Sequence, residues 1–218
     1  MTKKIVFWLD ADLTSFCLAY FLQQKLDVKL YAIVDITNKP KEFFLNQKLI
    51  HFEQIWFYHD YVLQSSDEIC DINELYTELN IPELIENDRI LNSEYNEFYN
   101  FTEIEKNSIA SNELNLFNEV LKIGPEIFVT SETNLRPHHT FHQFCQLKNI
   151  RILMLNNANW GELSYISENY HRLDNFNYLF QNRKNETSSF EKLEKRLEEK
   201  ILSKNLKSFY KKNRNSIF

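Results

Sequence analysis

The amino-acid sequence predicts an α/β protein: a Rossmann-like, mostly parallel sheet with helices on both faces, followed by a C-terminal helical tail. Strand and helix patterns alternate three times within the first sixty residues. A strand, a helix and a second strand follow one another again between Pro125 and Gly161. Hydrophobic residues make up 43% of the 218 residues, which is ample for a packed core. Such alternation favours parallel strands, because each helix carries the chain back to the starting edge of the sheet.

The N-terminal part of the chain supplies the first elements. Apolar runs rich in Val, Ile and aromatic residues predict its strands, and apolar residues at helical spacing predict the helices between them. The strands are predicted at 4–9, 28–34 and 54–58, and the helices at 13–24 and 41–49. Either Asp12 or Thr14 can cap the first helix through a side-chain oxygen.

The later elements surround one long amphipathic helix. Thr102 is predicted to cap this helix, and Gly124-Pro125 stops it after Ile123. Helices are also predicted at 72–79, 82–87, from about 137, and from 190 onward, and strands at 126–130, 150–155 and 163–167. We therefore predict a Rossmann-like domain over residues 1–180, and a hinge with a helical tail over residues 181–218.

The glycine and cysteine counts exclude several kinds of site. Gly124 and Gly161 are the only two glycines, whereas dinucleotide fingerprints and P-loops each need several within a few residues. No cofactor is therefore predicted. The three cysteines are odd in number and far apart, and Cys17 and Cys145 fall in apolar helical patterns. They are predicted to be reduced core thiols of a cytoplasmic protein.

The charge is unevenly distributed along the chain. The net charge is −6, but five basic residues and no acidic one follow Ser203, so removing these five leaves −11 for residues 1–202. An acidic body argues against nucleic acid as a partner. No apolar run reaches the length of a membrane span. The basic end is either a solvated tail or a weak peripheral contact with an anionic membrane, and the tail helix either packs on its own domain or forms a homodimer.

The candidate site lies at the carboxyl ends of the predicted strands, where open parallel sheets bind their ligands. Asp10 and Asp12 follow the first strand, and Glu132 follows the strand at 126–130. Asp12, Glu132 or His138 could accept a proton from a substrate hydroxyl. The alternative for the two aspartates is that Asp12 caps the helix and Asp10 is solvated.

A second group of polar residues surrounds the helix predicted from about Pro137. Its histidines either cap or pack the helix or contact the substrate, and a metal on His138 and His142 would need a third ligand, so none is predicted. Amides can bind sugar hydroxyls and an indole can stack on a sugar ring, although a plain turn explains the same residues almost as well. The predicted substrate-binding residues are Asp10, Thr14, Arg136, His139, Asn156, Asn159 and Trp160.

Three segments resemble bacterial capsule and surface-polysaccharide biosynthesis proteins: KKIVFWLDADLTSFCLAYFLQQK, ELNLFNEVLKIGPEIFVTSE and HHTFHQFCQLKNIRILMLNNANWG. They are similar to the N-terminal, Rossmann-like half of glycosyltransferase-B type enzymes, over about residues 3–175. The resemblance implies an acceptor-binding half that works with a second half that binds a nucleotide sugar. After residue 175 only about forty residues follow, too few for a second such domain.

These observations predict a glycosyltransferase-like protein of surface or capsular polysaccharide biosynthesis that acts on a glycan acceptor. The alternative is a non-catalytic module that binds a nucleotide or glycan, or half of a split enzyme that needs a partner chain. A protein that only assembles through its tail is a third interpretation. Whether the chain is itself an enzyme stays open at this stage, because the donor-binding domain is missing from the pattern.

Overall fold

The computed structural model describes residues 2–63, 81–86, 88–92, 99–131, 135–157 and 164–168, together with Asp174 and Lys195. Residues 1–156 and 165–172 form one compact unit. A second unit, residues 157–164 and 173–218, is described only at Asn157, Ser164, Asp174 and Lys195. The predicted helix at 72–79, and the predicted hinge and tail apart from Lys195, therefore lie outside the described residues.

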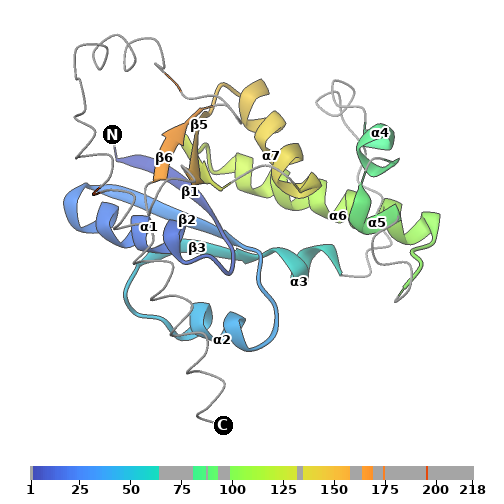
Figure 1. Cartoon of the computed structure of the whole chain (residues 1–218), viewed down its shortest axis with the longest axis horizontal. Helices are drawn as coiled ribbons and strands as arrows, with labels where there is room; N and C mark the ends of the chain where they lie inside the picture. Colours follow the sequence, from blue (N-terminus) through green and yellow to red (C-terminus); the bar gives the residue numbers. More distant parts are fainter. Residues whose placement is uncertain are drawn as a thin grey trace. The chain divides into compact units, whose positions relative to one another are not determined.

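The sheet of the first unit has six strands in the order β3-β2-β1-β4-β5-β6 (Figure 1). The pairs β1–β2, β2–β3, β1–β4 and β4–β5 are all parallel, which confirms the predicted α/β fold. The strands are β1 (Lys3–Leu9), β2 (Val28–Val34), β3 (Phe52–Phe57), β4 (Ile127–Thr130), β5 (Arg151–Asn157) and β6 (Ser164–Ser167).

Five of the helices lie within a few residues of predicted ones, whereas the short helices Tyr58–Val62 and Arg89–Asn92 were not predicted. The short β6 was also predicted, and the long helix begins after Thr102 as expected. The helices are α1 (Thr14–Lys25), α2 (Asn38–Asn46), α3 (Tyr58–Val62), α4 (Ile81–Glu86), α5 (Arg89–Asn92), α6 (Glu103–Lys122) and α7 (Arg136–Leu147). None of the described helices is both long and apolar enough to cross a membrane.

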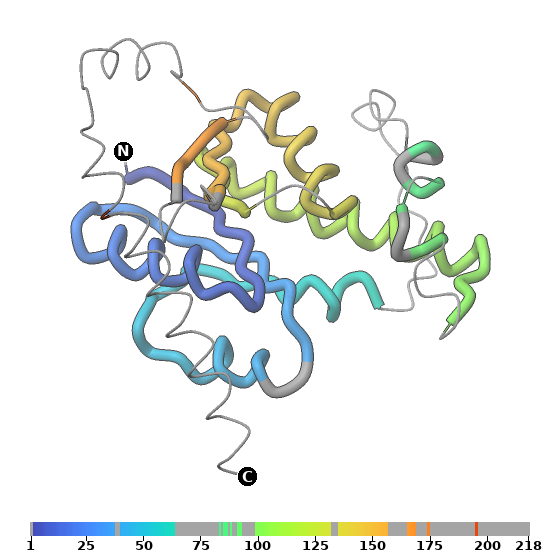
Figure 2. Tube along the Cα trace, in the orientation of Figure 1, coloured from blue at the N-terminus to red at the C-terminus, as the bar shows by residue number. Residues whose placement is uncertain are grey.

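Both faces of the sheet are covered, which explains why its strands are apolar at successive positions rather than at alternate ones. On β1, Val6 and Trp8 belong to one core cluster, whereas Phe7 and Leu9 belong to the other. Helices α3, α6 and α7 contribute to the first cluster, and α1 and α2 to the second (Figure 1). The short helices α4 and α5 lie beside the N-terminal half of α6, where Ile85 packs with its neighbours (Figure 2).

Other details also differ from the sequence prediction. Helix α2 begins at Asn38 rather than after Pro40, because a proline is tolerated in the first turn, where its missing N–H has no acceptor within the helix. Tyr58 begins α3 instead of ending β3. Cys17 is exposed on α1, so its predicted place in the core was wrong, whereas Cys145 is buried as expected.

Candidate functional site

The strand order creates a topological switch point between β1 and β4. Strand β2 pairs with one edge of β1, and β4, which comes later in the chain, pairs with the other edge of β1. Asp10 follows β1 and Ser131 follows β4, so the two residues face each other at the carboxyl edge. The Ser131 hydroxyl donates a long hydrogen bond to Asp10 Oδ2, at 3.4 Å. In open α/β sheets this is the crevice where ligands bind.

Asp10 and Asp12 shape the loop between β1 and α1. Asp10 Oδ1 accepts a hydrogen bond from the Asp12 backbone N–H at 2.8 Å. Asp12 Oδ1 in turn accepts from the backbone N–H of Thr14 at 2.9 Å and from its hydroxyl at 2.6 Å. The Thr14 hydroxyl, and then its backbone N–H, lower the pKa of Asp12. Asp12 and Thr14 thus hydrogen-bond to each other at the start of α1. The N-cap residue is Leu13, so the prediction that Asp12 or Thr14 occupies this position was wrong. The predicted catalytic and binding roles of Asp12 and Thr14 stay predictions.

Asp35 and His59 form a second polar pair at the same edge. Asp35 follows β2, and His59 lies at the start of α3, just after β3. His59 Nε2 lies 2.9 Å from Asp35 Oδ1, and 37% of the His59 side chain is exposed. A neutral imidazole that carries its proton on Nε2 has its lone pair on Nδ1. A histidine oriented by a carboxylate in this way is suited to accept a proton from a ligand hydroxyl.

Asp35 and His59 are absent from the predicted site residues, although the sequence carries a signal for them. Like Asp10 and Glu132, they lie just after predicted strands, at the edge of the sheet where ligands bind. The sequences IVD at 33–35 and FYHD at 57–60 place a carboxylate or a histidine directly after each strand.

His138 lies next to these groups but is buried. Its ring centroid is 4.3 Å from that of Trp8, in an edge-to-face arrangement, and 4% of the residue is exposed. Burial lowers the pKa of His138, while the carboxylates of Asp35 and Asp10 oppose this effect. The imidazole is therefore neutral at pH 7. Neither of its ring nitrogens has a hydrogen-bond partner among the described residues.

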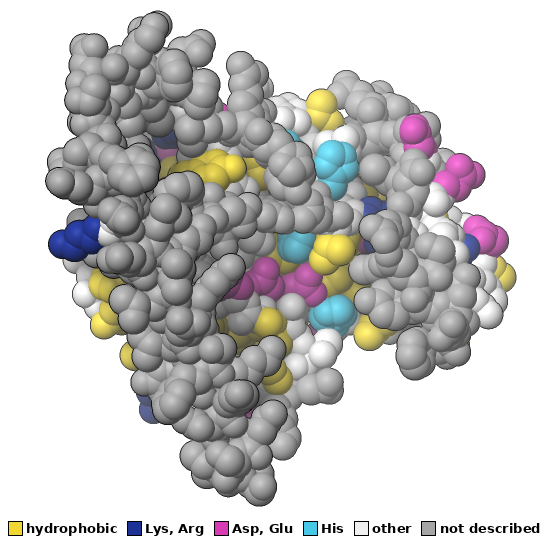
Figure 3. All heavy atoms as spheres, in the orientation of Figure 1, with side chains coloured by type: hydrophobic (Ala, Val, Ile, Leu, Met, Phe, Trp, Pro, Cys, Tyr) yellow, Lys and Arg dark blue, Asp and Glu magenta, His cyan; other side chains and the backbone are white. Residues whose placement is uncertain are grey.

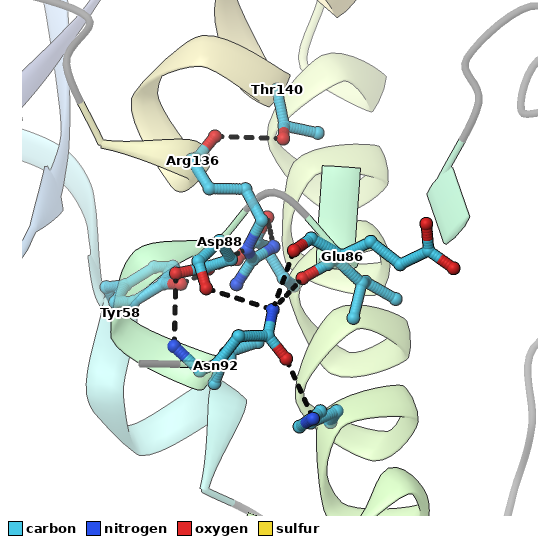
Figure 4. Close-up of polar contacts among 10 residues, drawn as sticks. Tyr58, Glu86, Asp88, Asn92, Arg136 and Thr140 are labelled. Atoms are coloured by element: carbon cyan, nitrogen blue, oxygen red, sulfur yellow. Dashed lines mark hydrogen bonds and ion pairs between the residues drawn. The ribbon is translucent and has the colours of Figure 1, made fainter. Parts of the chain in front are cut away.

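Arg136, the first residue of α7, is held by two buried carboxylates. Its Nε donates to Asp88 Oδ2, and its Nη1 donates to Glu113 Oε1 at 2.8 Å. The Tyr58 hydroxyl donates to the other Glu113 oxygen at 2.6 Å, and Figure 4 shows Tyr58, Asp88 and Arg136 pointing toward one another. Burial alone would lower the pKa of Arg136, but its anionic partners outweigh burial and raise it. The predicted contact of Arg136 with a substrate remains untested, and the contacts seen here join α3, α6 and α7.

The remaining predicted site residues are more dispersed. Asn156 is buried, and its Nδ2 donates to Ser167 Oγ at 2.7 Å, which links β5 to β6. His139 is exposed on α7, with its ring stacked 6.5 Å from that of His142. The other predicted residues lie outside the described part of the chain: Glu132, Asn159 and Trp160.

The described carboxyl edge is rich in acidic groups. In Figure 3 acidic and histidine side chains lie next to one another in the middle of the view. Lys41 is bound to both Asp60 oxygens, at 2.6 and 2.7 Å, and lies over the Phe57 ring. Lys41 and Arg136 therefore already have carboxylate partners. Such an edge suits the hydroxyl groups of a neutral ligand, because carboxylates accept hydrogen bonds from hydroxyls and repel anions.

No three histidine, cysteine or carboxylate side chains within the described ranges are placed to hold a metal ion together. Comparison of the sequence with models of known protein families and with curated proteins gives no match.

Proposed function

We propose that this chain is a glycosyltransferase-like protein of surface or capsular polysaccharide biosynthesis that binds a glycan acceptor at the carboxyl edge of its sheet. The observation that carries the proposal is the contact of 2.9 Å between His59 and Asp35, beside the switch point marked by Asp10 and Ser131. The Rossmann-like strand order supports it, since this is where such sheets bind ligands. The cytoplasmic location predicted from the cysteines belongs to the same proposal.

In this mechanism His59 is the general base. With the imidazole proton on Nε2, which lies 2.9 Å from Asp35 Oδ1, the Nδ1 lone pair is available to accept a proton. Nδ1 takes the proton of an acceptor hydroxyl as its oxygen forms a bond to the anomeric carbon of the donor sugar. The bond from that carbon to the nucleoside diphosphate breaks, and the nucleoside diphosphate leaves with the electron pair. Asp35 then stabilises the imidazolium that has formed.

The test is a sugar-transfer assay with purified full chain, a panel of nucleotide sugars and oligosaccharide acceptors. His59→Gln and Asp35→Asn are expected to lower the transfer rate by about 10²–10⁴-fold, while acceptor binding changes little. The matched control is His51→Gln, which should leave the rate unchanged. His51 is exposed and directly precedes β3, whereas His59 follows the other end of that strand. Equal rates in His59→Gln and wild type would show that this pair is not the base.

A second candidate function is a non-catalytic acceptor-binding half that needs a partner chain for the donor. The observation in its favour is that Lys41 and Arg136 are both occupied by carboxylates, whereas a diphosphate needs cationic or amide donors. Glycan binding measured by calorimetry without any transfer would favour this candidate. If the chain neither binds a glycan nor transfers a sugar, both candidate functions are excluded.

A further inference from the structure

Three side chains beneath the switch point have polar atoms that are buried and lack a hydrogen-bond partner among the described residues. These atoms are Trp8 Nε1, Thr130 Oγ1 and both ring nitrogens of His138. Trp8 is 1% exposed and Thr130 is 0% exposed. Buried polar groups in folded proteins are nearly always hydrogen-bonded, so a cluster of unsatisfied ones is unusual.

The three side chains belong to β1, β4 and α7. In the parallel register Phe7 is opposite Val129, and Trp8 and Thr130 are the next residues on these two neighbouring strands. They point to the same face, because side chains alternate along a strand and Phe128 shares the core cluster of Trp8. The ring of His138 lies 4.3 Å from the Trp8 ring on that face.

We propose that Trp8, Thr130 and His138 form a subsite that hydrogen-bonds one neutral hydroxyl group of a sugar ligand. The proposal deepens the function proposed above and rests on it, since it names the ligand class of the same carboxyl edge. Because all three side chains are buried, they would contact a single hydroxyl group rather than a whole sugar ring. The rest of the ligand would lie over Asp10 and Ser131, which are partly exposed directly after Leu9 and Thr130.

The chemistry of the three side chains matches a hydroxyl group. The Trp8 indole only donates, a neutral imidazole offers one donor and one acceptor, and a threonine hydroxyl does both. A ligand hydroxyl also donates and accepts, so it can satisfy the indole N–H and an imidazole nitrogen at once. A metal or ammonium ion cannot accept from the indole.

An anion is disfavoured by the charges around the subsite. The carboxylates of Asp10 and Asp35 act on His138, and Arg136 at the start of α7 is already bound to Asp88 and Glu113. The N-terminus of α7 attracts negative charge, but this effect corresponds to about half an elementary charge and is opposed by the two carboxylates.

The experiment follows the indole N–H of Trp8 by ¹H–¹⁵N NMR of the full chain, with the peak assigned from Trp8→Phe. The probes are glucose, galactose, mannose and N-acetylglucosamine, and inorganic phosphate. At least one sugar is expected to shift the Trp8 peak saturably, while phosphate leaves it in place. The Trp56 indole, which donates to Glu119 at 3.1 Å, is the internal reference and should not move.

Matched variants separate the subsite from general damage to the fold. Thr130→Val replaces the hydroxyl with a methyl group of the same size and is expected to weaken sugar binding by about tenfold, which corresponds to about 1.4 kcal/mol. Thr130→Ser keeps a hydroxyl and should bind within about twofold of wild type. An unchanged Trp56 peak in both variants shows that the sheet is intact.

Several results would overturn the subsite. These are a Trp8 shift with phosphate but not with sugars, equal binding by Thr130→Val and wild type, or no shift with any sugar, in which case the three groups enclose only water.

The two proposals fail separately. Sugar binding seen at Trp8 without any transfer, or transfer insensitive to His59→Gln, rejects the catalytic role alone. Transfer that depends on His59 with no response at Trp8 rejects the subsite alone.

Discussion

The guanidinium of Arg136 donates from Nη1 to Glu113 Oε1 across 2.8 Å, and both side chains are buried. Arg136 begins α7, which follows the switch point, and Glu113 lies in the middle of α6. Asp88 binds the Nε of the same guanidinium, so one cation satisfies carboxylates from two separate segments. The pair therefore fixes the start of α7, and with it the position of His138.

Arg136→Met is expected to lower the free energy of unfolding by about 3–5 kcal/mol, because it removes the guanidinium that pairs with the buried Glu113 carboxylate. Urea denaturation of wild type and variant measures the difference. The matched control is Lys29→Met, which breaks the ion pair of Lys29 with Glu53, where both side chains are substantially exposed. This change should cost less than about 1 kcal/mol. Similar losses in the two variants would show that the buried network does not stabilise the fold.

His138 should make the stability of the protein depend on pH. Burial lowers the pKa of His138 in the folded state, so the unfolded chain takes up a proton at this position at a higher pH than the folded protein does. The stabilisation is therefore fully present above the ordinary histidine pKa of about 6.5, and it is lost as the pH falls from there toward the lowered pKa.

Wild type is accordingly expected to lose more unfolding free energy than His138→Gln between about pH 7.5 and about pH 5.5. Urea denaturation at both pH values gives the two losses. His51→Gln, at an exposed histidine, is the control and should lose as much as wild type. An equal loss in wild type and His138→Gln would mean that this histidine is not the source of the pH dependence.

Thr102→Ala should lower the unfolding free energy by about 1 kcal/mol, because it removes a capping box. The Thr102 hydroxyl accepts from the Glu105 backbone N–H at 3.3 Å, and Glu105 Oε2 accepts from the Thr102 backbone N–H at 2.8 Å. Thr102→Ser keeps both bonds and is expected to stay close to wild type in urea denaturation. If Thr102→Ser lowered the unfolding free energy as much as Thr102→Ala, the threonine methyl group rather than the cap would be the source of the stabilisation.

Gly124→Ala should cost about 1–2 kcal/mol for a purely backbone reason. Gly124 has a φ of +65°, and a Cβ built there meets no atom within 4 Å, so there is strain but no clash. Gly124→Asn is expected to cost less, because asparagine tolerates left-handed backbone, as Asn149 does at a φ of 54°. Thermal or urea unfolding of both variants tests this order, and equal losses would contradict it.

Much of the fold could be predicted because local patterns carry it. The apolar runs of β1 and β2, the helical spacing in α6 and the stop at Gly124 are all local properties of the chain, and the structure places these elements within a few residues of the predictions. The boundary of α2 was missed because Pro40 is compatible both with the residue before a helix and with its first turn.

The candidate site was only partly predictable, because its residues are far apart in the sequence. Asp10 could be proposed from its place after a strand, but its contact with Ser131 depends on β4 pairing with β1. Arg136 was predicted to bind substrate from its place at the start of a helix, and nothing near it in the sequence indicated that Asp88 and Glu113 would bind its guanidinium.

The sequence by itself determined the alternation of strands and helices, the two-sided burial of the sheet and the polar residues at the strand ends, since each depends on neighbouring residues and their periodicity. Only the tertiary structure decided the partners: Asp35 with His59, Arg136 with Glu113, and Trp8 with His138. Strand order and helix packing set these contacts, because burial and charge are satisfied between segments that only the folded chain brings together.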